Sequence, residues 1–231
     1  MEETTRSGRS RRTSSVYRLV EGIHRFKAKH FDMHRELYER LVKFGQKPEA
    51  LFITCSDARV DPADLVQAEP GELFIVRNVG NLVPPYRESQ QGASVGAAIQ
   101  YAVQVLGVSD IIVCGHFECG AMATLLGPPE PLESLPMVRR WLRHGDRTRR
   151  TVDDKYVTLP AAARLAAGSE ENVLVQLEHV RSYPFVAERL EEGSLHLHGW
   201  VYDIAVGEVY RYDPQAQQYV AILKTGELRS R

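Results

Sequence analysis

Residues 50–59 have the sequence Ala-Leu-Phe-Ile-Thr-Cys-Ser-Asp-Ala-Arg, in which a mostly apolar run passes directly into polar residues. An apolar run of this length, bounded on its amino side by Lys47 and Pro48, is typical of a buried β-strand. Such a strand presents Cys55 and the polar side chains after it at its carboxyl end. The stretch therefore predicts a buried sheet with chemically active side chains along one edge.

Two more runs of the same kind follow along the chain. Residues 72–78, ELFIVRN, come after a Pro70-Gly71 turn, and residues 110–115, DIIVCG, lie directly before His116. Between them, residues 92–106 form a helical run rich in small side chains, which can pack closely on several sides. Alternating strands and helices predict an α/β fold with a mostly parallel central β-sheet flanked by helices.

The two ends of the chain have different patterns. Residues 1–16 are rich in Arg, Ser and Thr without apolar periodicity, which predicts a flexible arm. Residues 16–44 have apolar side chains at helical spacing, so we expect an N-terminal helical arm of one or two helices. Residues 171–190 also predict helices. The alternating pattern of residues 195–223 predicts a C-terminal strand extension.

Neither an internal repeat nor a linker divides the chain, so we expect a single domain over residues 17–231. Within it, residues 127–160 form a Pro- and Arg-rich insert, with six arginines between positions 139 and 150. Because no aromatic interleaving or nucleic-acid motif accompanies these arginines, a solvated face or an oligomer contact is favoured.

The composition is that of an ordinary soluble globular protein. The chain of 231 residues carries 29 basic and 30 acidic side chains, so its formal net charge is -1. Such a balance gives no bulk electrostatic reason for binding nucleic acid or an anionic membrane. No apolar run approaches the roughly 18 to 20 residues that span a bilayer, and the N-terminus lacks the apolar core of a secretory signal. We therefore expect a cytoplasmic protein that binds neither nucleic acid nor membrane.

The chain has three cysteines, Cys55, Cys114 and Cys119. A disulfide framework needs more cysteines and an even number of them. The segments CSDAR (55–59) and HFECG (116–120) each follow an apolar strand, and together they offer two thiolates, an imidazole and a carboxylate. In a parallel sheet the loops after neighbouring strands lie side by side. A Cys2His set suits Zn²⁺ and leaves a fourth position for chemistry. A core histidine beside a buried thiol is the alternative that spacing leaves open.

Other cysteine and histidine residues are weaker candidates. Cys114 precedes His116 by two residues and is a rival ligand, although a packed core thiol is favoured. His196 and His198 alternate on a strand and suit either a metal pair or simple packing. His144 and His179 are candidates for proton shuttling by residue type alone.

Three ordered segments make a specific resemblance. CSDARV (55–60), GELFIVRNVGNLV (71–83) and GHFECGAM (115–122) closely resemble the signature segments of the β-class carbonic anhydrases. The resemblance covers most of the chain apart from the arm and the insert. It implies a zinc enzyme, with one Zn²⁺ per subunit, that converts CO2 reversibly to bicarbonate and a proton through a zinc-bound hydroxide.

The resemblance also implies a set of site residues. Cys55, His116 and Cys119 would be the zinc ligands, with Asp57 and Arg59 as a dyad beside the metal. Asp57 would accept a hydrogen bond from the zinc-bound hydroxide, while Arg59 holds the carboxylate away from the metal. If that pair breaks, Asp57 becomes a fourth ligand and the site closes.

Five further residues match family positions that contact substrate. The Gln46 amide and the Gly120 backbone N–H would donate to the substrate oxygen. Phe74, Val79 and Tyr101 would form an apolar CO2 pocket, partly across a subunit interface, as in the plant and cyanobacterial branch. A surface glutamine and ordinary core side chains are the alternatives at these positions.

The resemblance also concerns partners and location. It implies a homodimer or higher homo-oligomer that acts on CO2 and bicarbonate. Phe52 replaces a tryptophan that forms an inhibitory bicarbonate site in some bacterial members, which groups the chain with the plant and cyanobacterial branch. Hydrolysis of CS2 or COS at the same zinc site, or an inactive zinc-stabilised scaffold or regulatory protein, are alternative functions. The N-terminal arm is a candidate docking segment, and a carboxysome is a possible location if the source is autotrophic.

Overall fold

The computed structural model describes residues 15–222 and 228–230. These residues divide into two compact units, one ending at Gly45 and the other beginning at Gln46. The first unit consists of α1 (Ser15–Arg25), a π-helical turn η1 (Phe26–Phe31) and α2 (Arg35–Phe44), as the helical spacing predicted. The flexible arm expected over residues 1–16 lies outside the described residues, except for its last two, which belong to α1.

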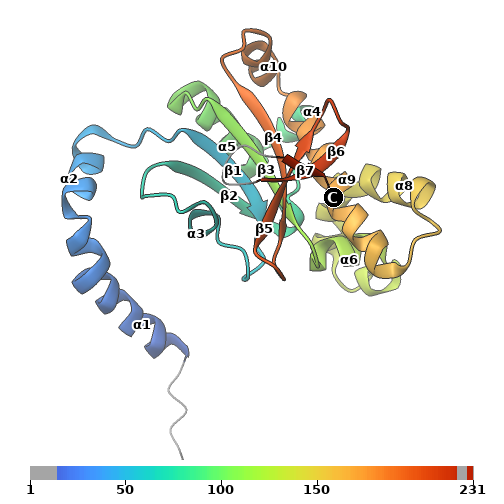
Figure 1. Ribbon diagram of the computed structural model, residues 1–231, viewed down its shortest axis with the longest axis horizontal. Helices are drawn as coiled ribbons and strands as arrows, with labels where there is room; N and C mark the ends of the chain where they lie inside the picture. Colours follow the sequence, from blue (N-terminus) through green and yellow to red (C-terminus); the bar gives the residue numbers. More distant parts are fainter. Residues whose placement is uncertain (1–14, 223–227, 231) are drawn as a thin grey trace, which may run out of the picture. The chain divides into compact units, whose positions relative to one another are not determined.

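A seven-stranded sheet organises the described part of the second unit (Figure 1). Its spatial order is β2-β1-β3-β4-β5-β6-β7. Strands β2, β1, β3 and β4 are parallel, and β5, β6 and β7 continue the sheet in antiparallel pairs. The mostly parallel sheet and its C-terminal strand extension are therefore confirmed. The strands are β1 (Ala50–Cys55), β2 (Leu73–Asn78), β3 (Asp110–His116), β4 (His196–Asp203), β5 (Glu208–Asp213), β6 (Gln218–Ile222) and β7 (Leu228–Ser230).

The parallel register brings the carboxyl ends of β1, β2 and β3 to the same edge of the sheet. Cys55 at the end of β1 pairs with Asn78 at the end of β2, and Thr54 pairs with Cys114 on β3. The Thr54 hydroxyl also donates to the Cys114 carbonyl at 2.9 Å. The loops that follow these three strands consequently leave the sheet side by side.

Helices and short turns connect the strands of the second unit. The predicted insert folds mainly as α7 and α8. Helix α9 begins at Ala161, whereas the sequence pattern predicted a start near residue 171. The stretch AAARLAA at its start has high helix propensity. It lacks a clear apolar stripe, and the prediction relied on such a stripe. These elements are α3 (Pro62–Val66), η2 (Val79–Asn81), α4 (Tyr86–Ser89), α5 (Ser94–Gln100), η3 (Tyr101–Leu106), α6 (Gly120–Leu126), η4 (Glu130–Leu132), α7 (Pro136–Leu142), η5 (Arg143–Gly145), α8 (Asp146–Lys155), α9 (Ala161–Arg181) and α10 (Pro184–Glu191).

Side-chain alternation along β1 divides the core between the two faces of the sheet. Leu51 and Ile53 join the larger cluster, which includes side chains of α5, η3, α9 and α10. Phe52 points to the opposite face, where it packs with Trp200 of β4 and Leu65 of α3. Most of the helices that cover the sheet therefore lie on one face.

No helix in the described ranges is long and apolar enough to cross a bilayer.

Candidate active site

Three buried donors meet at the carboxyl edge of the parallel strands. Cys55 ends β1, His116 ends β3, and Cys119 is the N-cap residue of α6. Their two sulfurs and one imidazole nitrogen all lie within 4.8 Å of one another. All three side chains are almost completely buried. Among the described residues, no other group of three or more His, Cys, Asp or Glu side chains has the spacing to hold a metal ion.

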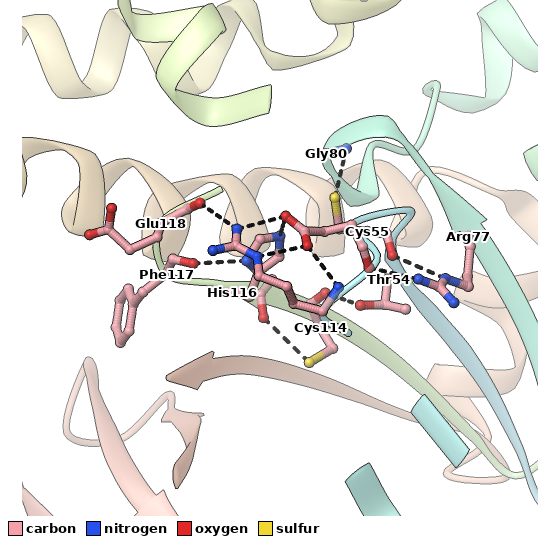
Figure 2. A network of polar contacts seen from close by, with 11 residues as sticks. Thr54, Cys55, Arg77, Gly80, Cys114, His116, Phe117 and Glu118 are labelled. Carbon is pink, nitrogen blue, oxygen red and sulfur yellow. Dashed lines mark hydrogen bonds and ion pairs between the residues drawn. The ribbon is translucent and has the colours of Figure 1, made fainter. Parts of the chain in front are cut away.

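The orientation of His116 fits metal ligation. Its Nδ1 donates to the Phe117 carbonyl at 2.8 Å, so the lone pair lies on Nε2 (Figure 2). Nε2 is buried and has no hydrogen-bond partner within the described part of the chain. Because an unpaired buried nitrogen costs about 1–3 kcal/mol, this atom needs a compensating partner. Soft thiolates and an imidazole form the donor set that Zn²⁺ prefers, so the residues fit zinc.

The sulfurs of Cys55 and Cys119 influence each other's ionisation. The Cys119 thiol donates to Cys55, and this bond lowers the pKa of Cys55 to about 4 although burial acts in the opposite direction. His116 and the Gly80 N–H also favour the Cys55 thiolate. The pKa of Cys119 is raised, first by this bond to Cys55 and then by burial. A divalent cation between the two sulfurs would remove this competition for one proton.

Asp57 and Arg59 form a bidentate pair beside the three donors. Arg59 Nε lies 2.9 Å from Asp57 Oδ1, and Arg59 Nη2 lies 2.8 Å from Oδ2. These bonds hold the pKa of Asp57 well below its usual range. Asp57 Oδ2 is 3.8 Å from His116 Nε2. The carboxylate thus borders the donor group while Arg59 holds it, and the structure has the arrangement in which the dyad is intact.

Two arginines connect the loops of the site. Arg59 Nη2 also donates to the Glu118 carbonyl at 3.0 Å, and Glu118 has a left-handed φ of 54°. Arg77 on β2 donates to the carbonyls of Cys55 at 3.2 Å and Asp57 at 2.8 Å (Figure 2). Sequence reasoning assigned no role to Arg77, because its partners are backbone oxygens and every residue has one. Both arginines fix backbone next to the donors.

The structure places the two predicted substrate donors near opposite ends of the parallel strands. Gly120 is the first residue of α6 and directly follows Cys119. Gln46 is exposed before β1 and has no hydrogen bond to any described residue. Since the six residues of β1 span roughly 20 Å, Gln46 lies far from Cys55 of its own chain. The family resemblance grouped these residues, but one chain does not bring them together.

The three predicted pocket residues are also divided. Val79 follows β2 at the carboxyl edge and lines a groove of about 570 Å³ with Ser56 and Trp141. Phe74 lies near the start of β2, and its ring stacks against Tyr101 with 5.9 Å between ring centroids. Val79 and Tyr101 are each 45% exposed, so they are surface side chains in a single chain rather than core.

The rival cysteine lies apart from the metal donors. Cys114 is fully buried in the cluster with Phe52 and Trp200, and its sulfur points away from the Cys55 sulfur (Figure 2). Burial raises the pKa of the Cys114 thiol to about 12. It is therefore a packed core thiol, the alternative that the sequence favoured.

The other candidate histidines contact acidic or backbone groups. His198 and His196 lie 2.8 and 3.9 Å from the same oxygen of Asp110. His144 lies 3.2 Å from Glu88 Oε2. His179 Nδ1 lies 2.8 Å from the Val83 carbonyl oxygen. None of the four belongs to the group of metal donors found among the described residues.

Comparison with known proteins gives consistent matches. The family model described as carbonic anhydrase matches residues 50–209. The carbonic anhydrase of the cyanobacterium Synechocystis sp. is 46% identical over 206 residues, which are 89% of this chain and 74% of that protein. The solved β-carbonic anhydrase CcaA is 44% identical with a TM-score of 0.88 and covers 92% of this chain and 94% of its own.

A more distant match adds a related assembly. Two β-carbonic anhydrases from the ascomycete Sordaria macrospora are described as tetrameric; the matched chain is 25% identical with a TM-score of 0.73 and covers 85% of this chain and 96% of its own. The names of these relatives favour CO2 hydration over hydrolysis of CS2 or COS and over an inactive scaffold. Together with the fold and the Cys-His-Cys site, they show that the chain belongs to the β-class carbonic anhydrases, enzymes that hydrate CO2 reversibly to bicarbonate and a proton.

Proposed function

We propose that Cys55, His116 and Cys119 hold the zinc ion of this carbonic anhydrase, one ion per subunit. The observation that carries the proposal is the buried Nε2 of His116, which lies within 4.8 Å of both cysteine sulfurs and lacks a partner among the described residues. When bound, zinc would supply a Lewis acid that makes water nucleophilic near neutral pH. The ligand set leaves a fourth position for that water.

Asp57 is assigned to orient the attacking water. Its Oδ2 borders the ligand group and can accept a hydrogen bond from water beside it. Arg59 holds both carboxylate oxygens, so the carboxylate stays available as an acceptor instead of joining the ligands. In the closed form that we propose as an alternative state, Asp57 leaves Arg59 and becomes the fourth ligand.

Substrate binding is assigned to groups at the same edge of the sheet and to a second subunit. Gly120 is the first residue of α6, so its N–H has no partner within that helix and can donate to a bicarbonate oxygen. Val79 provides an apolar contact for CO2 in the groove beside the site.

The remaining substrate residues support a homodimer or larger homo-oligomer. Gln46, Phe74 and Tyr101 lie away from the zinc ligands of their own chain, and we assign them to the site of a neighbouring subunit. The tetrameric relatives from Sordaria macrospora support an assembly of more than one chain. Gln46 would donate to the substrate oxygen, and the stacked pair would close the apolar pocket across the interface.

A cytoplasmic location is also proposed, on the composition and the likeness to a cyanobacterial enzyme. Docking to a carboxysome or another partner through residues 1–16 is a separate proposal. Deleting residues 1–14 tests it, since a docking segment predicts lost partner binding with unchanged CO2 hydration.

One experiment tests the zinc proposal directly. Zinc content by mass spectrometry and CO2 hydration by stopped flow are measured on the wild type, Cys55→Ala and the control Cys114→Ala. We expect one zinc per chain in the wild type and the control, and loss of both zinc and hydration in Cys55→Ala. Full hydration by a verified metal-free Cys55→Ala protein would overturn the proposal. Turnover of CS2 on the same preparation tests the hydrolase alternative.

A further inference from the structure

The turn that follows β2 contacts a metal-ligand sulfur. The Gly80 N–H donates to Cys55 Sγ at 3.4 Å (Figure 2). Gly80 has a φ of 81° and Asn81 a φ of 47°, so two successive residues are left-handed. A Cβ on Gly80 would lie 3.0 Å from the Ala121 Cβ. The turn is therefore sharp, conformationally costly and pressed against α6, and a chain holds such a turn only when surrounding contacts determine it.

Trp141 supplies one of these contacts. Its indole Nε1 donates to the Val79 carbonyl at 2.7 Å. That carbonyl and the Gly80 N–H belong to the same peptide group, which therefore accepts from Trp141 at one end and donates to Cys55 at the other. Two hydrogen bonds at opposite ends of one amide polarise and strengthen each other. Trp141 lies on α7, within the Pro- and Arg-rich insert, and packs on the apolar cluster around the two ligand cysteines.

Asn172 supplies the second contact, on the next peptide group. Its Nδ2 donates to the Gly80 carbonyl at 3.0 Å. Asn172 Oδ1 in turn accepts from Gln176 at 3.0 Å, and the Gln176 amide oxygen accepts from the Val83 N–H at 2.8 Å. Asn172 and Gln176 are completely buried on α9. Burying amide groups is costly unless they form hydrogen bonds. These two side chains bond largely to the backbone of the turn, at the Gly80 carbonyl, and to the segment after it, at the Val83 N–H.

We propose that Trp141 and Asn172 are positioning residues of the metal centre, which fix successive peptide groups so that the Gly80 N–H meets the Cys55 sulfur. The proposal rests on the zinc ligation proposed above. A donor on a ligand sulfur fixes its direction and reduces the electron density that it gives to the metal. The same bonds hold Val79 at the groove beside the site. The insert thus contributes to the metal centre through one indole N–H.

The test separates the hydrogen bonds from simple packing. Trp141→Phe removes the N–H and keeps an aromatic ring, and benzothienylalanine at position 141 replaces the N–H with sulfur at nearly the same shape. Asn172→Leu removes the second donor. The control is Trp200→Phe, since Trp200 packs edge-on against Phe52 and its indole has no hydrogen bond to a described residue.

Two readouts besides activity are measured on every protein. Zinc affinity is determined by competition with a chromophoric chelator, and we expect it to fall about 10- to 100-fold in the Trp141 and Asn172 variants. In the cobalt-substituted protein, the thiolate-to-cobalt charge-transfer band should move to longer wavelength, because a sulfur without its N–H donor is more electron-rich. Trp200→Phe should change neither quantity.

The outcomes separate this inference from the zinc proposal. A wild type without a thiolate-to-cobalt band would refute ligation by the cysteines and the inference with it. A wild type that shows the band, with affinity and band unchanged in the Trp141 variants, would leave zinc ligation standing and overturn the positioning role. If Asn172→Leu does not fold, the two Trp141 substitutions still decide the question.

Discussion

The guanidinium of Arg59 binds both carboxylate oxygens of Asp57, with N–O distances of 2.9 and 2.8 Å. The same group reaches the Glu118 carbonyl, so one side chain fixes a carboxylate and the loop that carries Cys119. A planar fork can form this pattern, whereas an ammonium group cannot. Arg59 is therefore the point at which the two active-site loops are held together.

Replacing Arg59 with Ala should lower CO2 hydration turnover by about 10²- to 10⁴-fold, since Asp57, which we propose orients the attacking water, loses the partner that holds it. Zinc content should stay at the wild-type level, because Cys55, His116 and Cys119 are unchanged. Stopped-flow turnover and metal analysis on one preparation measure both quantities.

Two comparisons sharpen this prediction. Arg59→Lys keeps the charge and loses the fork, so its turnover should fall between those of Ala and wild type. Arg139→Ala removes an exposed arginine of the insert and should have wild-type turnover. Equal turnover in Arg59→Ala and Arg139→Ala would refute the role of the dyad.

Gly80→Ala should destabilise the protein more than Gly107→Ala. Both glycines have a positive φ, 81° and 69°, so each substitution carries backbone strain of roughly 1–2 kcal/mol. Only at Gly80 does the added Cβ meet neighbours, at 3.0 Å from Ala121 and 3.3 Å from Met122, whereas nothing lies within 4 Å at Gly107. Denaturant unfolding measures the difference, and equal losses would show that the turn relaxes without cost.

Arg77→Met should reduce both stability and turnover by loosening the segment after β1. The substitution keeps most of the apolar stem and removes two charged hydrogen bonds to the carbonyls of Cys55 and Asp57. Bonds of this kind contribute about 1.5–3 kcal/mol when buried and less at an exposed position such as this one. We expect a lower unfolding free energy and a fall in turnover, measured by denaturant titration and stopped flow. Arg150→Met, at an exposed site on α8, is the control, and an equal effect there would contradict the assignment.

Acid should weaken the fold through two half-buried histidines. Burial lowers the pKa of His144 and of His179, although Glu88 opposes the shift at His144. As pH falls through 6.5, the ordinary pKa of histidine, the unfolded chain therefore takes up protons at a higher pH than the folded chain does. Their contribution to stability is full above that pH and is lost as pH falls toward the lowered folded values.

The readout is the slope of unfolding free energy between about pH 7 and 5. It should become shallower in the double variant His144→Gln/His179→Gln, whatever the absolute stability of that variant. A double variant with the wild-type slope would show that other groups take up the protons.

Much of the fold and the grouping of Cys55, His116 and Cys119 could be predicted, because both follow from side-chain pattern. Apolar runs identified β1, β2 and β3, and parallel pairing then required their following loops to be neighbours. Cys55 and His116 therefore had to end near each other, and the signature segments supplied the expected zinc chemistry. The same alternation that buries Phe52 also sends Cys114 to the opposite face from Cys55.

What could not be predicted depends on backbone groups and on distance across the sheet. Trp141 and Arg77 donate hydrogen bonds to backbone carbonyl oxygens. Every residue has such an oxygen, so the sequence does not show which ones accept. Gln46 precedes Cys55 by only nine residues, yet an extended strand between them carries the two to opposite edges. Short separation along a chain implies closeness only when the intervening residues turn.

The position of Gln46 has a kinetic consequence. On the proposed assignment of Gln46, Phe74 and Tyr101 to the site of a neighbouring subunit, an isolated chain would bind its metal and still lack a substrate donor and part of the pocket wall. Zinc per chain would then be independent of dilution. For a homodimer, specific activity would instead decline in proportion to protein concentration once that concentration drops well below the dissociation constant of the dimer. On the same assignment, assays at protein concentrations well below that dissociation constant would under-report the activity of the assembled enzyme.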